Sequence, residues 1–82
     1  MPRMKNTPKT AEAANALAGT RWAIGNDERI ITRVENAEIS KYDNVTVFAD
    51  IYWRKPDGKE RSTPTALTQF RTWLNKAEQV DY

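Results

Sequence analysis

The stretch from Val45 to Trp53 carries the residues best suited to bind another molecule. An alternating strand pattern assigns one face to Val45, Val47, Ala49, Ile51 and Trp53, and the other to Thr46, Phe48, Asp50 and Tyr52. The first face is apolar and suits a core, so the rings of Phe48 and Tyr52 are expected on the outer face. With Ile31 and Arg33 of the preceding strand they form an apolar and cationic patch, a composition enriched at protein interfaces.

Two other interpretations of this outer face stay open. In the first, a short N-terminal helix carrying Ala14 and Leu17 covers the outer face. In the second, a tight barrel buries both faces of the strand. We favour binding of a partner protein, or of a second copy of the chain through an exposed strand edge. The predicted protein-binding residues are Arg33, Phe48, Asp50, Tyr52 and Trp73.

A second cluster is basic and predicts a different partner. Four cations surround a turn-forming Pro-Asp-Gly sequence, namely Arg54, Lys55, Lys59 and Arg61. Beside Tyr52 they suit a phosphate backbone and a stacked base, and a cationic N-terminal arm adds Arg3, Lys5 and Lys9. Asp57 and Glu60 dilute this charge, as in an ordinary solvated turn, and the net charge is only +2. Nucleic-acid binding is therefore the alternative function.

Groups for catalysis are almost missing from the sequence. The chain has no His and no Cys, which excludes disulfides, thiolate nucleophiles, Cys/His zinc sites and His-dependent triads. Carboxylates such as Glu35 and Asp50 remain, but Asp50 between two outward-facing aromatic residues suits a partner arginine better than an active site. The three glycines are scattered and form no phosphate-binding loop. We expect no enzyme activity, metal, cofactor or small-molecule substrate.

Three tryptophans in so short a chain raise the question of a ligand cage. Trp22 and Trp53 lie on apolar stripes, which favours core packing. Trp73 lies at the edge of a helical stripe, where core packing and binding are both reasonable interpretations.

The elements that must position these residues are short. Residues 1–9 are typical of a flexible arm, and residues 11–18 favour a short helix capped by Thr10, or opened by Thr7-Pro8, and ended by Gly19. This helix is expected only if it docks through Ala11, Ala14, Leu17 and Ala18.

Strands are predicted over residues 22–24, 29–35 and 45–53, with turns at 25–27, 40–44 and 54–59. An irregular continuation of the second strand through Ile39 stays open. Residues 60–63 would form the returning strand of the last hairpin. A C-terminal helix follows, capped by Thr63, with Pro64 then in its first turn, or by Thr65. Its apolar stripe comprises Leu67, Phe70, Trp73, Leu74 and Ala77.

These elements predict one α+β domain. The 82 residues leave no room for a second core, and the sheet needs the helix to cover its inner residues, which are Trp22, Ile24, Ile30, Val34, Val47, Ile51 and Trp53. We expect a small, highly curved antiparallel sheet of about three to five strands over residues 19–82, preceded by a basic arm and short helix over residues 1–18. Apolar runs are too short for a membrane-spanning helix or a secretory signal, so a cytoplasmic location is expected.

Two short motifs carry a family resemblance. The Gly-Thr-Arg-Trp sequence at residues 19–22 and the segment from Thr63 to Leu74, with its Pro-x-x-Leu-x-x-Phe spacing, resemble the opening and closing motifs of small SH3-like barrels encoded by bacteriophages and mobile elements. The resemblance covers about residues 19–78 and departs from the pattern in its full closing helix. It implies an accessory module without catalysis, a regulator or inhibitor that acts by occupying a host protein, and it assigns no functional residues.

Overall fold

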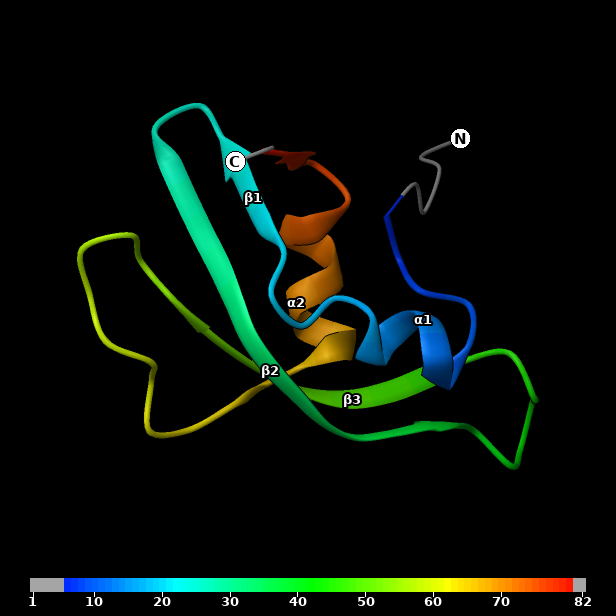
Figure 1. The fold of residues 1–82 in the computed structure, drawn as a ribbon. Coiled ribbons are helices and arrows are strands. Elements are labelled where there is room, and N and C mark those ends of the chain that lie inside the picture. The colour runs from blue at the N-terminus through cyan, green and yellow to red at the C-terminus, as the bar shows by residue number, and fades with distance from the viewer. Residues whose placement is uncertain (1–5, 81–82) are drawn as a thin grey trace.

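One antiparallel sheet and two helices make up the fold (Figure 1). The computed structural model describes residues 6–80. In chain order the elements are α1 (Ala11–Asn15), β1 (Arg21–Ile24), β2 (Asp27–Ile39), β3 (Val47–Arg54), β4 (Thr65–Ala66), α2 (Leu67–Leu74) and β5 (Glu78–Gln79). The strand order is β4-β3-β2-β1-β5. The predicted small α+β domain with an antiparallel sheet and a C-terminal helix is confirmed.

The sheet is open at both edges. β4 pairs only with β3, and β5 pairs only with β1, so the two short strands lie at opposite edges of the sheet. Closure into an SH3-like barrel is therefore not confirmed over the described residues. β5 is an element that we did not predict, because two polar residues show no alternation that would mark a strand.

Two irregularities bend β2. The pairing with β3 shifts between Ile31 and Arg33, and again between Glu35 and Glu38, as β-bulges do. The first shift lets Ile31 pair with Trp53 and Val34 pair with Ile51, so both face the core. The prediction that Ile31 joins the outer patch is thus wrong: Ile31 is fully buried. A simple alternating pattern does not predict the extra residue that a bulge inserts into the strand.

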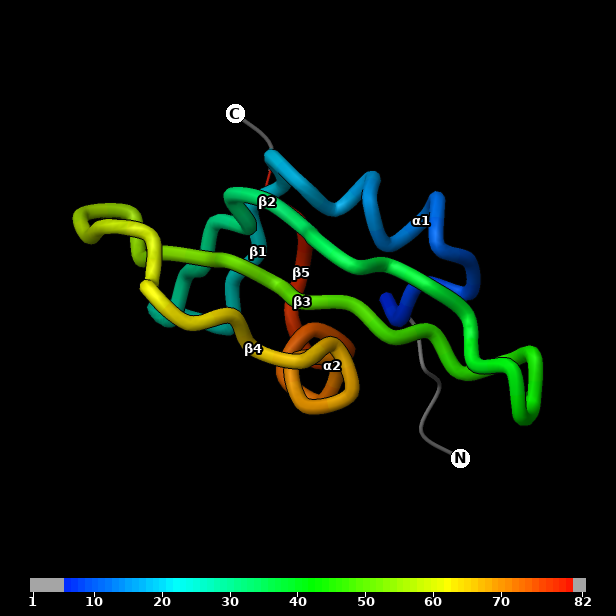
Figure 2. The backbone as a smooth tube through the Cα atoms, turned by 90° about the horizontal axis from the view of Figure 1, so that it is seen from below, coloured from blue at the N-terminus to red at the C-terminus, as the bar shows by residue number. Residues whose placement is uncertain are grey.

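The core lies between the inner face of the curved sheet and the two helices. From β3 it receives the alternate residues Val47, Ala49, Ile51 and Trp53, and from α2 it receives Leu67, Phe70 and Leu74. Figure 2 looks nearly along the axis of α2 and shows this helix beside β3 and β4. The predicted alternation from Val47 to Trp53 is confirmed. Val45 is wrongly assigned to the inner face, because the chain is still in the preceding turn there and Val45 is exposed.

The N-terminal segment packs against the body of the domain. Thr10 caps α1 by accepting a hydrogen bond from the Ala13 N–H at 3.0 Å, as predicted. Ala14 and Leu17 enter the common core, so α1 does not cover Phe48 and Tyr52. Part of the predicted arm contacts the body of the domain. The Asn6 side-chain amide donates to the carbonyl oxygens of Leu74, the last residue of α2, and of Ala77 beyond it, at 2.8 and 2.9 Å.

The segment between β3 and α2 differs most from the prediction. A turn forms as expected, with the Gly58 N–H bonded to the Lys55 carbonyl oxygen at 3.0 Å. Residues 60–63 form no strand, although the Arg61 N–H donates to the Trp53 carbonyl oxygen of β3 at 3.2 Å, and strand pairing begins only at Thr65–Ala66. Because these two residues pair with β3, α2 begins later than predicted. Ala66 is its N-cap residue, without a side-chain hydrogen bond, and Pro64 lies outside the helix.

Candidate functional site

The predicted outer patch comes together only in part. Phe48, Asp50 and Tyr52 project from the outer face of β3, and Arg33 lies beside them on β2. The Arg33 guanidinium carbon lies 3.8 Å from the centre of the Tyr52 ring. Tyr52 is half-buried by this contact, whereas Phe48 keeps 44% of its surface exposed.

Charges on this face are paired within the molecule. Arg33 forms ion pairs with Glu35 at 3.0 Å and with Glu60 at 3.2 Å, and the Asn36 amide donates to Asp50 at 2.8 Å. Burial and the neighbouring Glu35 carboxylate raise the pKa of Tyr52. These contacts leave Arg33 and Asp50 already engaged, so Phe48 is the member of the predicted patch that is most available to a partner.

Trp73 does not belong to the outer patch. It packs against the core next to Phe70, with ring centres 5.7 Å apart, and its indole N–H donates to Asp27 at 2.9 Å. Arg29 lies between two indole rings, with its guanidinium carbon 4.3 Å from the centre of Trp53 and 4.4 Å from that of Trp73. Hydrogen bonds from Lys55 and Trp73 lower the pKa of Asp27. These contacts of Asp27, Arg29 and Trp73 connect α2 to the sheet. The sequence pattern did not predict them, because the bulge in β2 changes which residues face the core.

The basic loop between β3 and β4 uses most of its cations internally. Lys55 pairs with Asp27, Arg61 lies 4.9 Å from the centre of the Trp53 ring, and Arg54 donates to carbonyl oxygens of its own loop. Lys59 has no such contact within residues 6–80. Lys9 is exposed, and Arg3 and Lys5 lie outside the described residues. The predicted nucleic-acid surface is therefore a loop with few uncommitted charges.

The opposite end of the molecule carries a feature that the sequence analysis missed. In both Figure 1 and Figure 2 the turn between β2 and β3 and the loop between β3 and β4 project at opposite ends. Every exposed large apolar side chain of residues 6–80 comes from the β2–β3 end: Ile39 (40% exposed), Tyr42 (100%), Val45 (73%) and Phe48 (44%). Tyr42 stands in a polar turn, where composition alone gave no reason to single it out.

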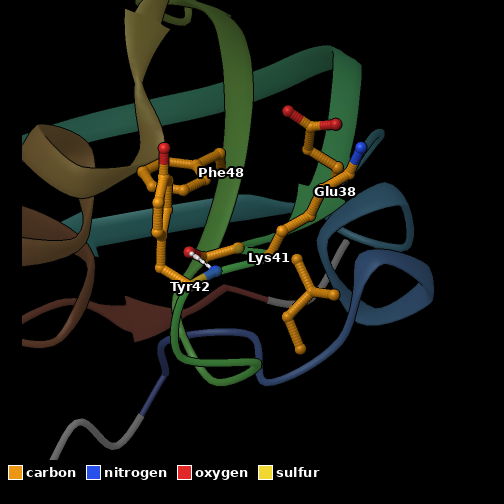
Figure 3. Close-up of a pocket in the computed structure, with 6 residues that line it drawn as sticks. Glu38, Lys41, Tyr42 and Phe48 are labelled. Atoms are coloured by element: carbon orange, nitrogen blue, oxygen red, sulfur yellow. Dashed lines mark hydrogen bonds between the residues drawn. The ribbon is translucent and has the colours of Figure 1, made fainter.

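Three of these side chains line one shallow pocket of about 280 Å³, together with Glu38 and Lys41. We call Ile39, Tyr42 and Phe48 the hairpin cluster. Figure 3 shows the side chains of Glu38, Lys41, Tyr42 and Phe48 around this pocket. The hairpin cluster thus combines two aromatic rings with nearby charges of both signs.

Hydrogen bonds fix the turn that presents the hairpin cluster. Ser40 is buried, its hydroxyl oxygen accepts from the Tyr42 N–H at 3.1 Å, and its N–H donates to the Thr46 carbonyl oxygen at 2.7 Å. Asp43 accepts from the backbone N–H groups of Val45 and Thr46 at 2.9 and 3.0 Å. The exposed Tyr42 ring is therefore attached to an ordered turn and the Phe48 ring to the adjoining strand β3, which reduces the entropy lost when a partner binds.

The turn should loosen in strong acid. Hydrogen bonds from the Thr46 hydroxyl and from the N–H groups of Thr46 and Val45 lower the pKa of Asp43 from 3.8 to about 2. Because the pKa is lowered in the folded state, the ionised carboxylate stabilises the turn above pH 3.8, and this stabilisation is lost as the pH falls to about 2. We expect the amide resonances of Val45 and Thr46 to shift over this pH range.

The matched control for this titration is Asp43→Asn, which keeps an acceptor oxygen and removes the titrating group. In this variant the two amide resonances should not follow the acid titration. Equal shifts in the variant and the natural chain would show that Asp43 does not organise the turn.

Within residues 6–80, no three acidic side chains are placed to hold a metal ion. Neither helix of this described part is long and apolar enough to cross a membrane. Comparisons of the chain with protein-family models, with curated proteins and with solved structures found no match.

Proposed function

We propose that this protein is a small protein-binding module that contacts its partner through the hairpin cluster and acts by occupancy, without covalent chemistry. One observation carries the proposal: the exposed large apolar side chains of residues 6–80 are confined to residues 39–48. Concentrated exposed apolar surface on a small polar domain is typical of an interaction site.

The chemistry of the hairpin cluster supports a protein as the partner. Tyrosine is among the residues that contribute most to protein interfaces, and a ring brings a large contact area with few rotatable bonds. Glu38 and Lys41 at the rim of the pocket provide charges of opposite sign for a polar border. Phe48 belongs to the predicted patch, and Tyr42 and Ile39 extend this patch toward the turn.

The resemblance to SH3-like barrels adds a finer proposal about biology. By that resemblance the module is a regulator or inhibitor from a bacteriophage or mobile element, acting on a host protein in the cytoplasm. A second copy of the chain is the other protein partner to consider, because isologous pairing needs only one self-complementary surface.

Nucleic-acid binding by the basic loop is the competing function. Lys59 supports it, because this side chain has no ion pair or hydrogen bond with the described residues. Lys55 pairs with Asp27, and Arg61 lies against the Trp53 ring. Because these two cations are already used within the molecule, the protein-binding proposal is favoured.

Affinity capture from a host-cell lysate tests the proposal, with nuclease-treated and untreated samples. The test variant combines Tyr42→Ser with Phe48→Ser, and the matched control combines Arg54→Ser with Lys59→Ser at the other end of β3. We expect a protein retained by the natural chain and the control but lost by the test variant, with an affinity reduced about 30-fold or more.

Two results would contradict this assignment. Retention that disappears on nuclease treatment, falls steeply with salt and depends on Arg54 and Lys59 would identify nucleic acid as the partner. Equal retention by all three proteins would show that the hairpin cluster is not the contact surface. If the partner is a second copy, the natural chain should sediment as a dimer and the test variant as a monomer.

A further inference from the structure

A second pocket lies on the other side of the β2–β3 turn. It has a volume of about 330 Å³ and is bordered by the start of β3, by residues 7–9 of the N-terminal segment, and by α2. Its apolar lining comes from Pro8, Val45 and Val47. This size and this mainly apolar surface are within the range of sites that bind small ligands or single side chains of a peptide.

The charge of this groove has one sign. Lys9 and Arg71 line it, and no acidic residue among residues 6–80 does. Neither side chain forms a hydrogen bond or ion pair with another described residue. Two uncommitted cations beside an apolar floor are complementary to a ligand that carries both carboxylates and an apolar group.

An unpaired strand edge runs along the groove. β4 pairs with β3 only at Asp50 and Ile51, so the strand residues before Asp50 have no strand neighbour on that side within residues 6–80. The Thr46 carbonyl oxygen accepts from Ser40 on the β2 side. Since backbone groups of successive strand residues alternate in direction, Val47, which lines the groove, directs its N–H and C=O away from β2, toward the unpaired edge. A peptide strand would find main-chain partners there.

We propose that this groove binds an extended acidic segment of a partner protein, which adds to the free edge of β3. In this arrangement an apolar side chain of the segment lies against Pro8 and Val45, and its carboxylates pair with Lys9 and Arg71. The five residues that precede Asn6 contain Arg3 and Lys5 and no acid, so charge does not favour them as the occupant. The site is distinct from the hairpin cluster and does not depend on the function proposed for it.

Nuclear magnetic resonance titrations of the full chain with three synthetic peptides test this site. The probes are acetylated and amidated pentapeptides: Glu-Val-Glu-Val-Glu, its uncharged counterpart Gln-Val-Gln-Val-Gln, and Lys-Val-Lys-Val-Lys. We expect saturable shifts at the amides of Thr46, Val47 and Arg71 with the acidic peptide, weaker binding of the uncharged one and no binding of the basic one. Lys9→Gln and Arg71→Gln should each reduce the affinity for the acidic peptide about two- to fivefold, the range of exposed ion pairs.

The control variant combines Tyr42→Ser with Phe48→Ser, which removes the rings of the hairpin cluster and leaves the groove intact. It should bind the acidic peptide with unchanged affinity, so failure of this proposal and failure of the proposed function are distinguishable. The proposal is overturned if the acidic peptide gives no saturable shift at residues 45–47. It is also overturned if the acidic and uncharged peptides bind equally, or if Lys9→Gln and Arg71→Gln leave the affinity unchanged.

Discussion

Ile51→Ala is expected to lower the free energy of unfolding by about 2–5 kcal/mol. Ile51 is fully buried at the centre of β3, where it pairs with Val34 on one side and with Thr65 on the other. Truncation removes apolar contacts and leaves a cavity between the sheet and α2. A domain of this size has a total stability of about 4–12 kcal/mol, so urea denaturation should show a large loss or complete unfolding.

Phe48→Ala on the same strand is the matched control. Phe48 is larger than Ile51 but lies on the outer face with 44% of its surface exposed, so we expect a loss below about 1 kcal/mol. The contrast depends on which face of β3 each side chain occupies. If Phe48→Ala destabilised the domain as much as Ile51→Ala, the phenylalanine would be a core residue and could not serve as a free binding surface.

The second large effect is expected from Trp53→Ala, which should cost about 3–5 kcal/mol of stability. Trp53 is buried and lies 6.2 Å from the Phe70 ring between centres, and the Arg29 and Arg61 guanidinium carbons lie 4.3 and 4.9 Å from its own centre. Removal of the indole also takes away one of the three aromatic rings around Arg29, the other two being Trp73 and Phe70. Thermal unfolding followed by circular dichroism measures the loss.

Trp53→Phe separates ring packing from the indole hydrogen bond. This variant keeps an aromatic ring but loses the donor to the Thr65 hydroxyl, which lies at 3.1 Å. We expect a smaller cost of about 1–2 kcal/mol. If Trp53→Ala and Trp53→Phe were equally destabilising, the hydrogen bond to Thr65 would matter more than the stacked cluster around Arg29.

The inner face of the domain was predictable from the sequence because burial follows period-two and helical spacing. Val47, Ile51 and Trp53 on β3 and Leu67, Phe70 and Leu74 on α2 occupy the core as predicted. Thr10 was predictable as a cap from its position before an alanine-rich stretch.

The bulge at Thr32 explains two failures of the sequence analysis. An inserted residue reverses the faces of β2 on either side of it, so Ile31 moves inward, and Arg29, two residues before it, shares that face. An alternating pattern of fixed period does not predict where such a residue is inserted. The pairing of Arg29 with Trp53 and Trp73 depends on contacts between residues far apart in the chain, which spacing does not encode.

The candidate site was predictable only in part for a related reason. Strand alternation predicted that Phe48 lies on the outer face. Tyr42 and Val45 belong to a turn, where no periodic pattern predicts which side chains are exposed. The groove near Lys9 and Arg71 joins three separate segments of the chain. Only the folded arrangement brings these residues together.

Site-specific photocrosslinking in host cells tests the central claim most directly. A photoreactive phenylalanine analogue replaces Tyr42 in one protein and Lys59 in another, so that each end of β3 reports its own neighbours. We predict one discrete protein crosslink from position 42 and none from position 59. A discrete crosslink from position 59 to protein or nucleic acid, with none from position 42, would contradict the assignment of the hairpin cluster as the binding surface.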